Sequence, residues 1–130
     1  MVEKLPPEVQ QAAQELEELQ ERYLAIVNQR TLIESEISEI KRVLEHLKEL
    51  PEGYKVFKNI GNVLFEESKE KVVKELSEKL ELDELLLDRY RKEEQSLKTQ
   101  IQTLQEKLKD MIAKHYQSLA TKEKKTITGS

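Results

Sequence analysis

Two histidines and a dense set of carboxylates are the side chains of this 130-residue chain whose types are suited to chemistry. His46 and His115 lie far apart, and the chain has no cysteine, so a structural zinc site lacks ligands. Glu34, Glu36 and Glu39 lie close together, but opposite charges and solvent surround them, without the apolar pocket that shifts a catalytic pKa. The sequence therefore predicts neither a metal site nor a catalytic site.

Phosphate chemistry is not indicated either. The three glycines, Gly53, Gly61 and Gly129, are too scattered to form a P-loop or a dinucleotide-binding turn. ATP is therefore not expected, and no cofactor is predicted. The chain is not expected to be an enzyme.

Composition excludes further classes of function. A formal net charge of -4 and a pI near 5.4 argue against nucleic-acid binding, which needs a basic face. No segment approaches the ~18 apolar residues of a membrane span, and none resembles a signal peptide. With no cysteine, a reducing compartment is permitted. We expect no membrane partner and a cytoplasmic location.

Two long runs of apolar residues, spaced three and four apart, dominate the chain. The first run is Val9, Ala12, Leu16, Leu19, Tyr23, Ile26, Ile33, Ile37, Ile40, Leu44 and Leu47, interrupted by Arg30. The second is Val73, Leu76, Leu80, Leu87, Tyr90, Leu97, Ile101, Leu104, Leu108 and Met111, interrupted by Asp83 and Glu94 and ending at His115. This heptad period predicts two helices that pack as a coiled coil.

The first helix is expected over about residues 7–49. Pro6 and Pro7 suit a helix start, because the first turn leaves its amides unpaired in any case. Pro51 disfavours helical geometry at the residue before it, and Gly53 is a terminator.

The second helix is expected over about residues 69–119. Ser68 is a suitable N-cap, with an acidic residue in the following turn. The last residues lose the heptad period, so 121–130 is predicted to be a flexible polar tail. Residues 1–120 would then form one domain.

A short β-hairpin is predicted between the helices, over about residues 54–67. This segment is rich in β-branched and aromatic residues around Gly61-Asn62, a pair that suits a two-residue hairpin loop. An isolated hairpin is marginally stable and exposes apolar side chains and unpaired edges. Either hairpins from several chains pair with one another, or the chain's own helix ends cover the hairpin.

The predicted fold class is all-α dominated: a long antiparallel two-helix coiled-coil hairpin with a short β-hairpin at the bend. Antiparallel pairing should bring together residues whose numbers sum to about 120, such as Leu19 and Ile101. It also places the hairpin at one end and both termini at the other. In this register Arg30 and Glu94 are expected to pair across the seam.

The apolar set broadens near both termini beyond what a two-helix seam requires. Two interpretations stay open: these residues hold the fraying end together, or they form an exposed patch that binds a partner. The candidate binding residues are Val2, Leu5, Pro6, Val9, Ala12, Ala13, Met111, Ile112, Tyr116 and Leu119.

Four segments carry a resemblance to a known family. They are KLPPEVQ at residues 4–10, LP at 50–51, VFKNIGNVLF at 56–65 and KEKVVKEL at 69–76. Together with the order helix, hairpin, helix, they resemble the β subunit of archaeal-type prefoldin over roughly residues 4–116. The single hairpin resembles the β type, since the family's α type carries two. The seam charges and the basic stretch 122–125 depart from the family's usual pattern.

The resemblance implies a heterohexamer of two α and four β subunits. Hairpins would form a β-barrel hub, and six coiled coils would extend from it and hold non-native client proteins at their tips. Clients would pass to a group II chaperonin without nucleotide. The implied hub residues are Tyr54, Val56, Phe57, Ile60, Val63, Leu64 and Phe65.

Two functions are therefore weighed. The first is an ATP-independent holdase subunit that protects non-native polypeptides. The alternative is a structural coiled-coil scaffold or tether that binds one defined folded partner.

Overall fold

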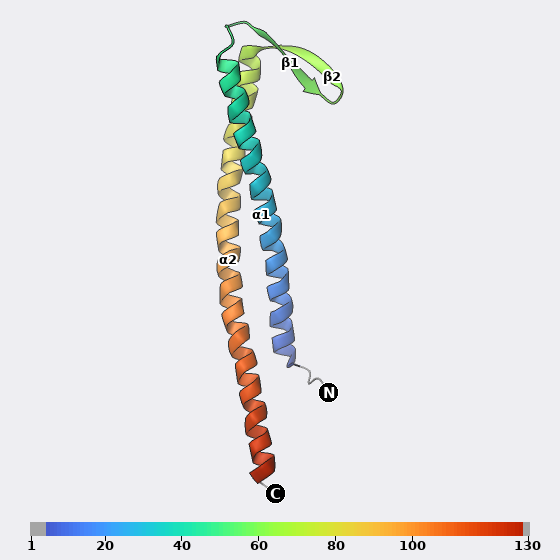
Figure 1. Ribbon diagram of the computed structural model, residues 1–130, viewed down its shortest axis with the longest axis vertical. Helices are drawn as coiled ribbons and strands as arrows, with labels where there is room; N and C mark the ends of the chain where they lie inside the picture. Colours follow the sequence, from blue (N-terminus) through green and yellow to red (C-terminus); the bar gives the residue numbers. More distant parts are fainter. Residues whose placement is uncertain (1–4, 129–130) are drawn as a thin grey trace. The chain divides into compact units, whose positions relative to one another are not determined.

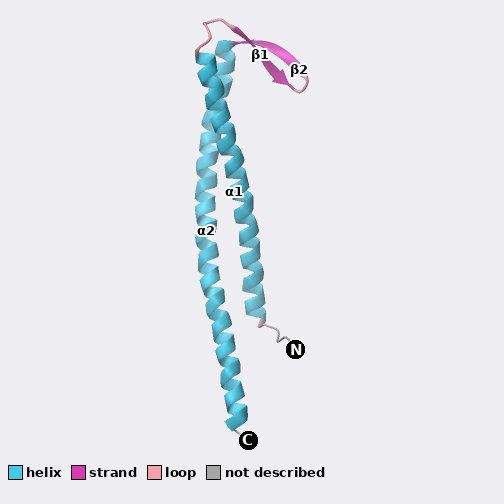
Figure 2. Cartoon of the chain, in the orientation of Figure 1, coloured by secondary structure: helices cyan, strands magenta, loops and turns pink. Residues whose placement is uncertain are grey.

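The computed structural model describes residues 5–128, and side chains as far as residue 121. The order of elements is α1 (Pro7–Lys48), β1 (Lys55–Ile60), β2 (Val63–Ser68) and α2 (Lys69–Thr128) (Figures 1 and 2). The predicted fold class is confirmed: two long helices are joined through a two-stranded antiparallel hairpin. Two compact sections can be distinguished, and each is described by itself. We call Val27–Lys92 the hairpin section, and Met1–Ile26 with Glu93–Ser130 the terminal section.

Helix α1 begins and ends where the prolines predict. The carbonyl of Pro6 accepts hydrogen bonds from the Val9 and Gln10 amides, at 3.0 and 3.1 Å, which closes the first turn. The helix ends at Lys48, one residue before the predicted boundary, and Gly53 follows with a φ of 75°. That left-handed backbone suits glycine and redirects the chain into β1.

The two strands pair in the register that follows from a two-residue loop at Gly61-Asn62. Ile60 is opposite Val63, Asn59 opposite Leu64, and Lys58 opposite Phe65. Gly61 has a φ of 60°, whereas none of the described non-glycine residues has a positive φ. A positive φ at the first loop residue alone is typical of a type II′ turn, which matches the twist of the strands.

Helix α2 begins as predicted and extends further than predicted. The Ser68 hydroxyl accepts a hydrogen bond from the Lys71 amide at 3.3 Å, so Ser68 is the N-cap. The helix continues to Thr128, whereas the sequence suggested an end at Leu119 and a polar tail from 121. Loss of the heptad period was a poor stop signal, because Ala, Lys and Glu favour a helix and no glycine or proline occurs between Leu119 and Gly129.

In the hairpin section, α1 and α2 pack antiparallel through the predicted seam. Ile37, Ile40 and Leu47 are buried there. Two ion pairs, Lys41–Glu84 at 3.6 Å and Glu36–Lys79 at 2.8 Å, join the helices. Their residue numbers sum to 125 and 115 (41 + 84 and 36 + 79), so the predicted register near 120 is confirmed here.

The terminal section has its own stretch of the seam. Val9, Ala12, Leu19 and Ile26 of α1 are buried, as is Leu97 of α2, which is 1% exposed. Leu19 lines a groove together with Gln100 and Leu104, on either side of its predicted partner Ile101. The same antiparallel register therefore describes this section.

Charged residues within the seam differ in their surroundings. Asp83 is buried, with 7% of its surface exposed, and its Oδ2 atom has no hydrogen-bond partner. Arg30 is half-buried and donates a hydrogen bond to Glu34 at 2.9 Å. The pairing of Arg30 with Glu94 stays a prediction. Among residues 5–128, no helix is long and apolar enough to cross a membrane.

Candidate assembly and binding surfaces

The β-hairpin exposes most of its apolar side chains. We define the hairpin surface as Tyr54, Phe57, Ile60, Val63, Leu64 and Phe65, which are between 48% and 68% exposed. Phe57 and Leu64, the most exposed of the six, lie on one face of the strands. Val56, the remaining predicted hub residue, is half-buried. A hairpin with this much open apolar surface is a strong candidate for pairing with another chain.

Polar contacts fix the base of this hairpin to the first turns of α2. The Lys58 ammonium donates to the Glu75 carboxylate at 2.6 Å, and the Gly53 amide donates to the Glu70 carboxylate at 2.8 Å. The Lys69 ammonium donates a hydrogen bond to the Leu50 carbonyl at 2.5 Å. We call the Lys58–Glu75 pair the hairpin latch.

Hydrogen bonds at the hairpin latch and at Gly53 shift the pKa values of the groups that they join. The hydrogen bond between the two side chains raises the pKa of Lys58 and lowers the pKa of Glu75. The amide of Gly53 likewise lowers the pKa of Glu70, because it favours the charged carboxylate. All three groups are therefore held in their charged forms at neutral pH.

Two interpretations of the hairpin were open: cover by the chain's own helix ends, or pairing with hairpins of other chains. Val56, Lys58 and Glu67 share one face of the strands and are half-buried beside the start of α2. The chain's own helix thus covers the base of that face. Ile60, Val63 and the apolar side chains of the opposite face are exposed, so the helix ends alone do not cover the hairpin.

The candidate binding residues near the termini are less accessible than the sequence suggested. Val9 and Ala12 are 2% and 8% exposed, because both belong to the seam, so the structure gives them a packing role. Leu5, Pro6, Met111, Ile112 and Leu119 are half-buried, while Ala13 and Tyr116 are exposed. Val2 lies outside the described residues.

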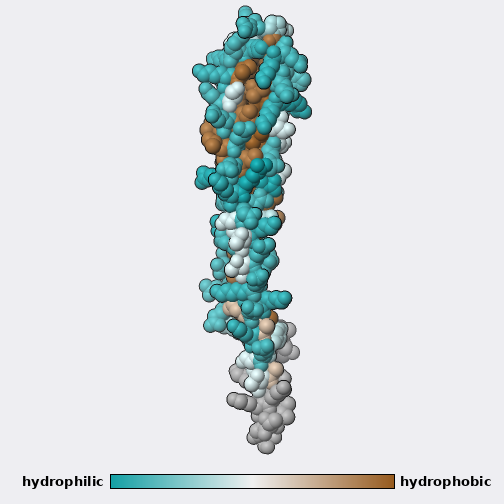
Figure 3. All heavy atoms as spheres, turned by 90° about the vertical axis from the view of Figure 1, so that its left-hand side faces the viewer, coloured by the Kyte–Doolittle hydropathy of each residue, from teal (hydrophilic) through white to brown (hydrophobic). Residues whose placement is uncertain are grey.

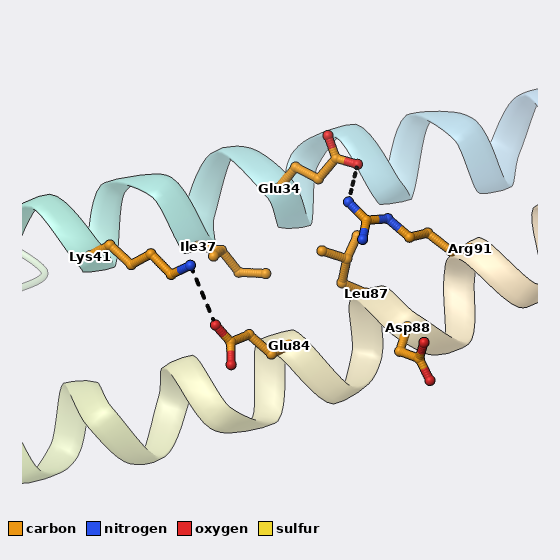
Figure 4. Close-up of a pocket in the computed structure, with 7 residues that line it drawn as sticks. All are labelled: Glu34, Ile37, Lys41, Glu84, Leu87, Asp88 and Arg91. Carbon is orange, nitrogen blue, oxygen red and sulfur yellow. Dashed lines mark ion pairs between the residues drawn. The ribbon is translucent and has the colours of Figure 1, made fainter.

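One side of the hairpin section carries a polar groove of about 520 Å³ between the helices. Its ion pairs are Lys41 with Glu84 at 3.6 Å and Arg91 with Glu34 at 3.5 Å. Figure 4 shows the apolar side chains of Ile37 and Leu87 between these two pairs. Arg30 and Arg91 lower the pKa of Glu34, mainly through the Arg30 hydrogen bond. The groove is a solvated stretch of seam whose charges pair across the helices.

No group of His, Cys, Asp or Glu within the described part of the chain could hold a metal ion. His46 is exposed, and His115 is half-buried with its ring 5.8 Å from that of Tyr116. Neither histidine has the surroundings of a ligand set.

Four exposed leucines of the helices lie outside the seam and were not identified from the sequence, among them Leu24, which is 61% exposed. Leu32 is 70% exposed, and Leu82 and Leu85 are 66% and 67% exposed. The signal was present in the sequence, since a seam with a 3.5-residue period has no place for them.

Comparison with known proteins decides the family. A family model described as prefoldin subunit matches residues 10–115. The chain belongs to the prefoldin family. The prefoldin β subunits of Sulfurisphaera tokodaii and Sulfolobus acidocaldarius are 38% and 36% identical to it over 116 residues, which is 89% of this chain and 93% of each relative.

The solved prefoldin β subunit from Thermococcus strain KS-1 has a similar fold. It matches with a TM-score of 0.73 and 28% identity, over 84% of this chain and 96% of that one. The expected resemblance to a prefoldin β subunit is therefore confirmed. Membership supports a non-enzymatic chaperone role and hetero-oligomeric assembly with other prefoldin subunits.

Proposed function

We propose that this chain is a β-type subunit of a cytoplasmic, ATP-independent holdase. Its hairpin surface would join an α-type subunit and further β subunits, in a hexamer such as the family implies. The assembly would bind non-native polypeptides and deliver them to a group II chaperonin. The observation that carries the proposal is the hairpin surface, six large apolar side chains that are about half to two-thirds exposed in the single chain.

Assembly also explains why weak contacts would suffice. A small apolar patch holds a client only weakly once ordering costs are subtracted. Several copies that act on one unfolded chain raise each other's local concentration, so the client is held while every single contact stays reversible. A factor that holds and then transfers a client needs that combination.

In this proposal the exposed candidates near the termini contact the client. Tyr116 and Ala13 supply open surface, and Ile112 and Leu119 supply partly covered surface. Val9 and Ala12 support them from the seam.

The test is client protection by the assembled complex. The chain is mixed with an α-type prefoldin subunit, its assembly is followed by native mass spectrometry, and dilution of urea-unfolded citrate synthase is followed by light scattering. Wild-type complex should suppress scattering without ATP, and Ile112→Gln with Tyr116→Gln should weaken suppression while the oligomer persists. Assembly without protection would favour the scaffold, and a persistent monomer would contradict the hub.

A further inference from the structure

The two sides of the hairpin section differ in character. One side holds the polar groove with its two ion pairs (Figure 4). The other is marked by the Glu36–Lys79 pair, which joins α1 to α2 at 2.8 Å. Glu34 and Glu36 are two residues apart on α1, so they project toward opposite sides of the pair. The exposed Leu32 and Leu82 lie on the Glu36 side.

Helical spacing places Leu32 and Leu82 on one side of the helix pair. Leu32 is four residues before Glu36, and Leu82 is three residues after Lys79, so each lies one turn from the ion pair on the same side of its helix. Because the helices are antiparallel, both displacements run in the same direction. Leu85 and Leu86 follow Leu82 by three and four residues, so they extend the surface by one turn of α2, and Leu85 points away from α1. We define the leucine face as Leu32, Leu82, Leu85 and Leu86.

We propose that the leucine face is a second client-binding surface, for extended apolar segments of non-native polypeptides. This inference rests on the proposed function and adds a surface that the residues near the termini do not include.

Accessibility after assembly favours this surface. The hairpin surface would be covered by neighbouring subunits, and Val9 and Ala12 are buried in the seam. Outside the hairpin, the exposed large apolar residues among those described are Leu24, Leu32, Val43, Leu82, Leu85 and Tyr116. Four of these six belong to the helices of the hairpin section. On the face drawn in Figure 3, apolar surface likewise gathers over that section.

The size of the face indicates the kind of occupant. Three open leucines and one half-buried leucine expose on the order of 300 Å², a size at which patches often mark binding surfaces. A stable complex between folded proteins needs roughly 800 Å² from each partner. The face is therefore too small for a permanent subunit contact and suits brief, repeated contact with an unfolded chain.

The decisive experiment compares exposed leucines within and outside the face. The complex with an α-type subunit is prepared with Leu32→Gln, Leu82→Gln and Leu85→Gln together, and separately with Leu24→Gln as the control. Glutamine keeps the helix propensity. Leu24 is 61% exposed and belongs to the terminal section. Protection of urea-unfolded citrate synthase should require at least ~3-fold more triple variant, and Leu24→Gln should match wild type.

A labelling experiment reports binding without altering the rest of the face. The chain has no cysteine, so Leu82→Cys or Leu24→Cys accepts one environment-sensitive fluorophore. Unfolded citrate synthase should blue-shift the probe at position 82 and leave the probe at position 24 unchanged.

The outcomes separate the two proposals. Failure of the wild-type complex to protect the client rejects the holdase and this inference with it. If wild type protects, but the triple variant protects equally well or the probe at position 82 does not respond, the leucine face is overturned and the holdase stands.

Discussion

Replacement of Asp83 tests how a buried carboxylate affects the stability of the coiled coil. It occupies a seam position of α2 where the heptad calls for an apolar residue, and it is 7% exposed. Burial raises its pKa, the nearby Glu36 carboxylate raises it further, and Lys79 opposes both. Its Oδ2 atom lacks a hydrogen bond. We predict that Asp83→Leu stabilises the coiled coil.

The expected gain follows from three contributions. A buried acceptor without a partner costs about 1–3 kcal/mol, and this cost disappears. Burying a leucine side chain contributes about 1.5–3 kcal/mol. Fitting a larger side chain into a packed seam costs about 1–3 kcal/mol, which offsets much of the gain. The net expectation is a free energy of unfolding higher by about 2 kcal/mol.

The measurement is urea unfolding of the single chain, followed by circular dichroism at 222 nm at one protein concentration, because assembly itself adds stability. The midpoint should rise without a change in the m-value. Asp88→Leu is the matched control. The side chain of Asp88 is 66% exposed and forms an ion pair with Lys92 at 3.1 Å, so its replacement should change stability little. If Asp83→Leu is no more stable than wild type while the control behaves as expected, the reasoning about the buried carboxylate is wrong.

Three further predictions concern pH, the latch and the turn. The pKa of Asp83 is raised in the folded state, so as pH falls the folded chain binds this proton before the unfolded chain does. As pH falls from the raised pKa toward the ordinary pKa of aspartate, wild type should therefore gain stability relative to Asp83→Asn. Urea unfolding across that pH range measures the difference. Lys58→Glu and Glu75→Lys should each weaken assembly in native mass spectrometry, and the double exchange should restore it, since the latch orients the hairpin; no rescue by the double variant argues against the pair. Gly61→Ala should destabilise the hairpin by about 1–2 kcal/mol and reduce assembly, because φ is 60° there, whereas Asn62→Ala should have little effect; equal effects would contradict the assigned turn.

Local signals predicted most of the fold. The prolines, the Ser68 cap and Gly61-Asn62 each act within a few residues, and they predicted the bounds of α1, the bounds of the hairpin and the start of α2 to within one or two residues. The heptad period fixed the partner of each helix and its register. The end of α2 was predicted wrongly because it was placed where the heptad period ends. Helix propensity alone continues the helix to Thr128.

The candidate surfaces were harder to predict, because accessibility depends on tertiary packing. Val9 and Tyr116 are both apolar residues near the termini, but one packs in the seam at 2% exposure and the other is 61% exposed. The latch was hidden for a similar reason. Lys58 and Glu75 are 17 residues apart, and only the turn of the hairpin onto α2 brings them together.

Asp83 and the leucine face are opposite departures from the same seam rule, and both lie in the hairpin section. A charge is buried where a leucine would stabilise, and leucines are exposed where charges would improve solubility. The first lowers the stability of the helix pair and the second maintains apolar surface in water, so neither arrangement follows from folding alone. A subunit that must keep apolar contacts open for clients has a reason for the exposed leucines. The buried Asp83 gains nothing from that role, and because its Oδ2 atom lacks a hydrogen bond, its replacement by leucine is expected to stabilise the chain.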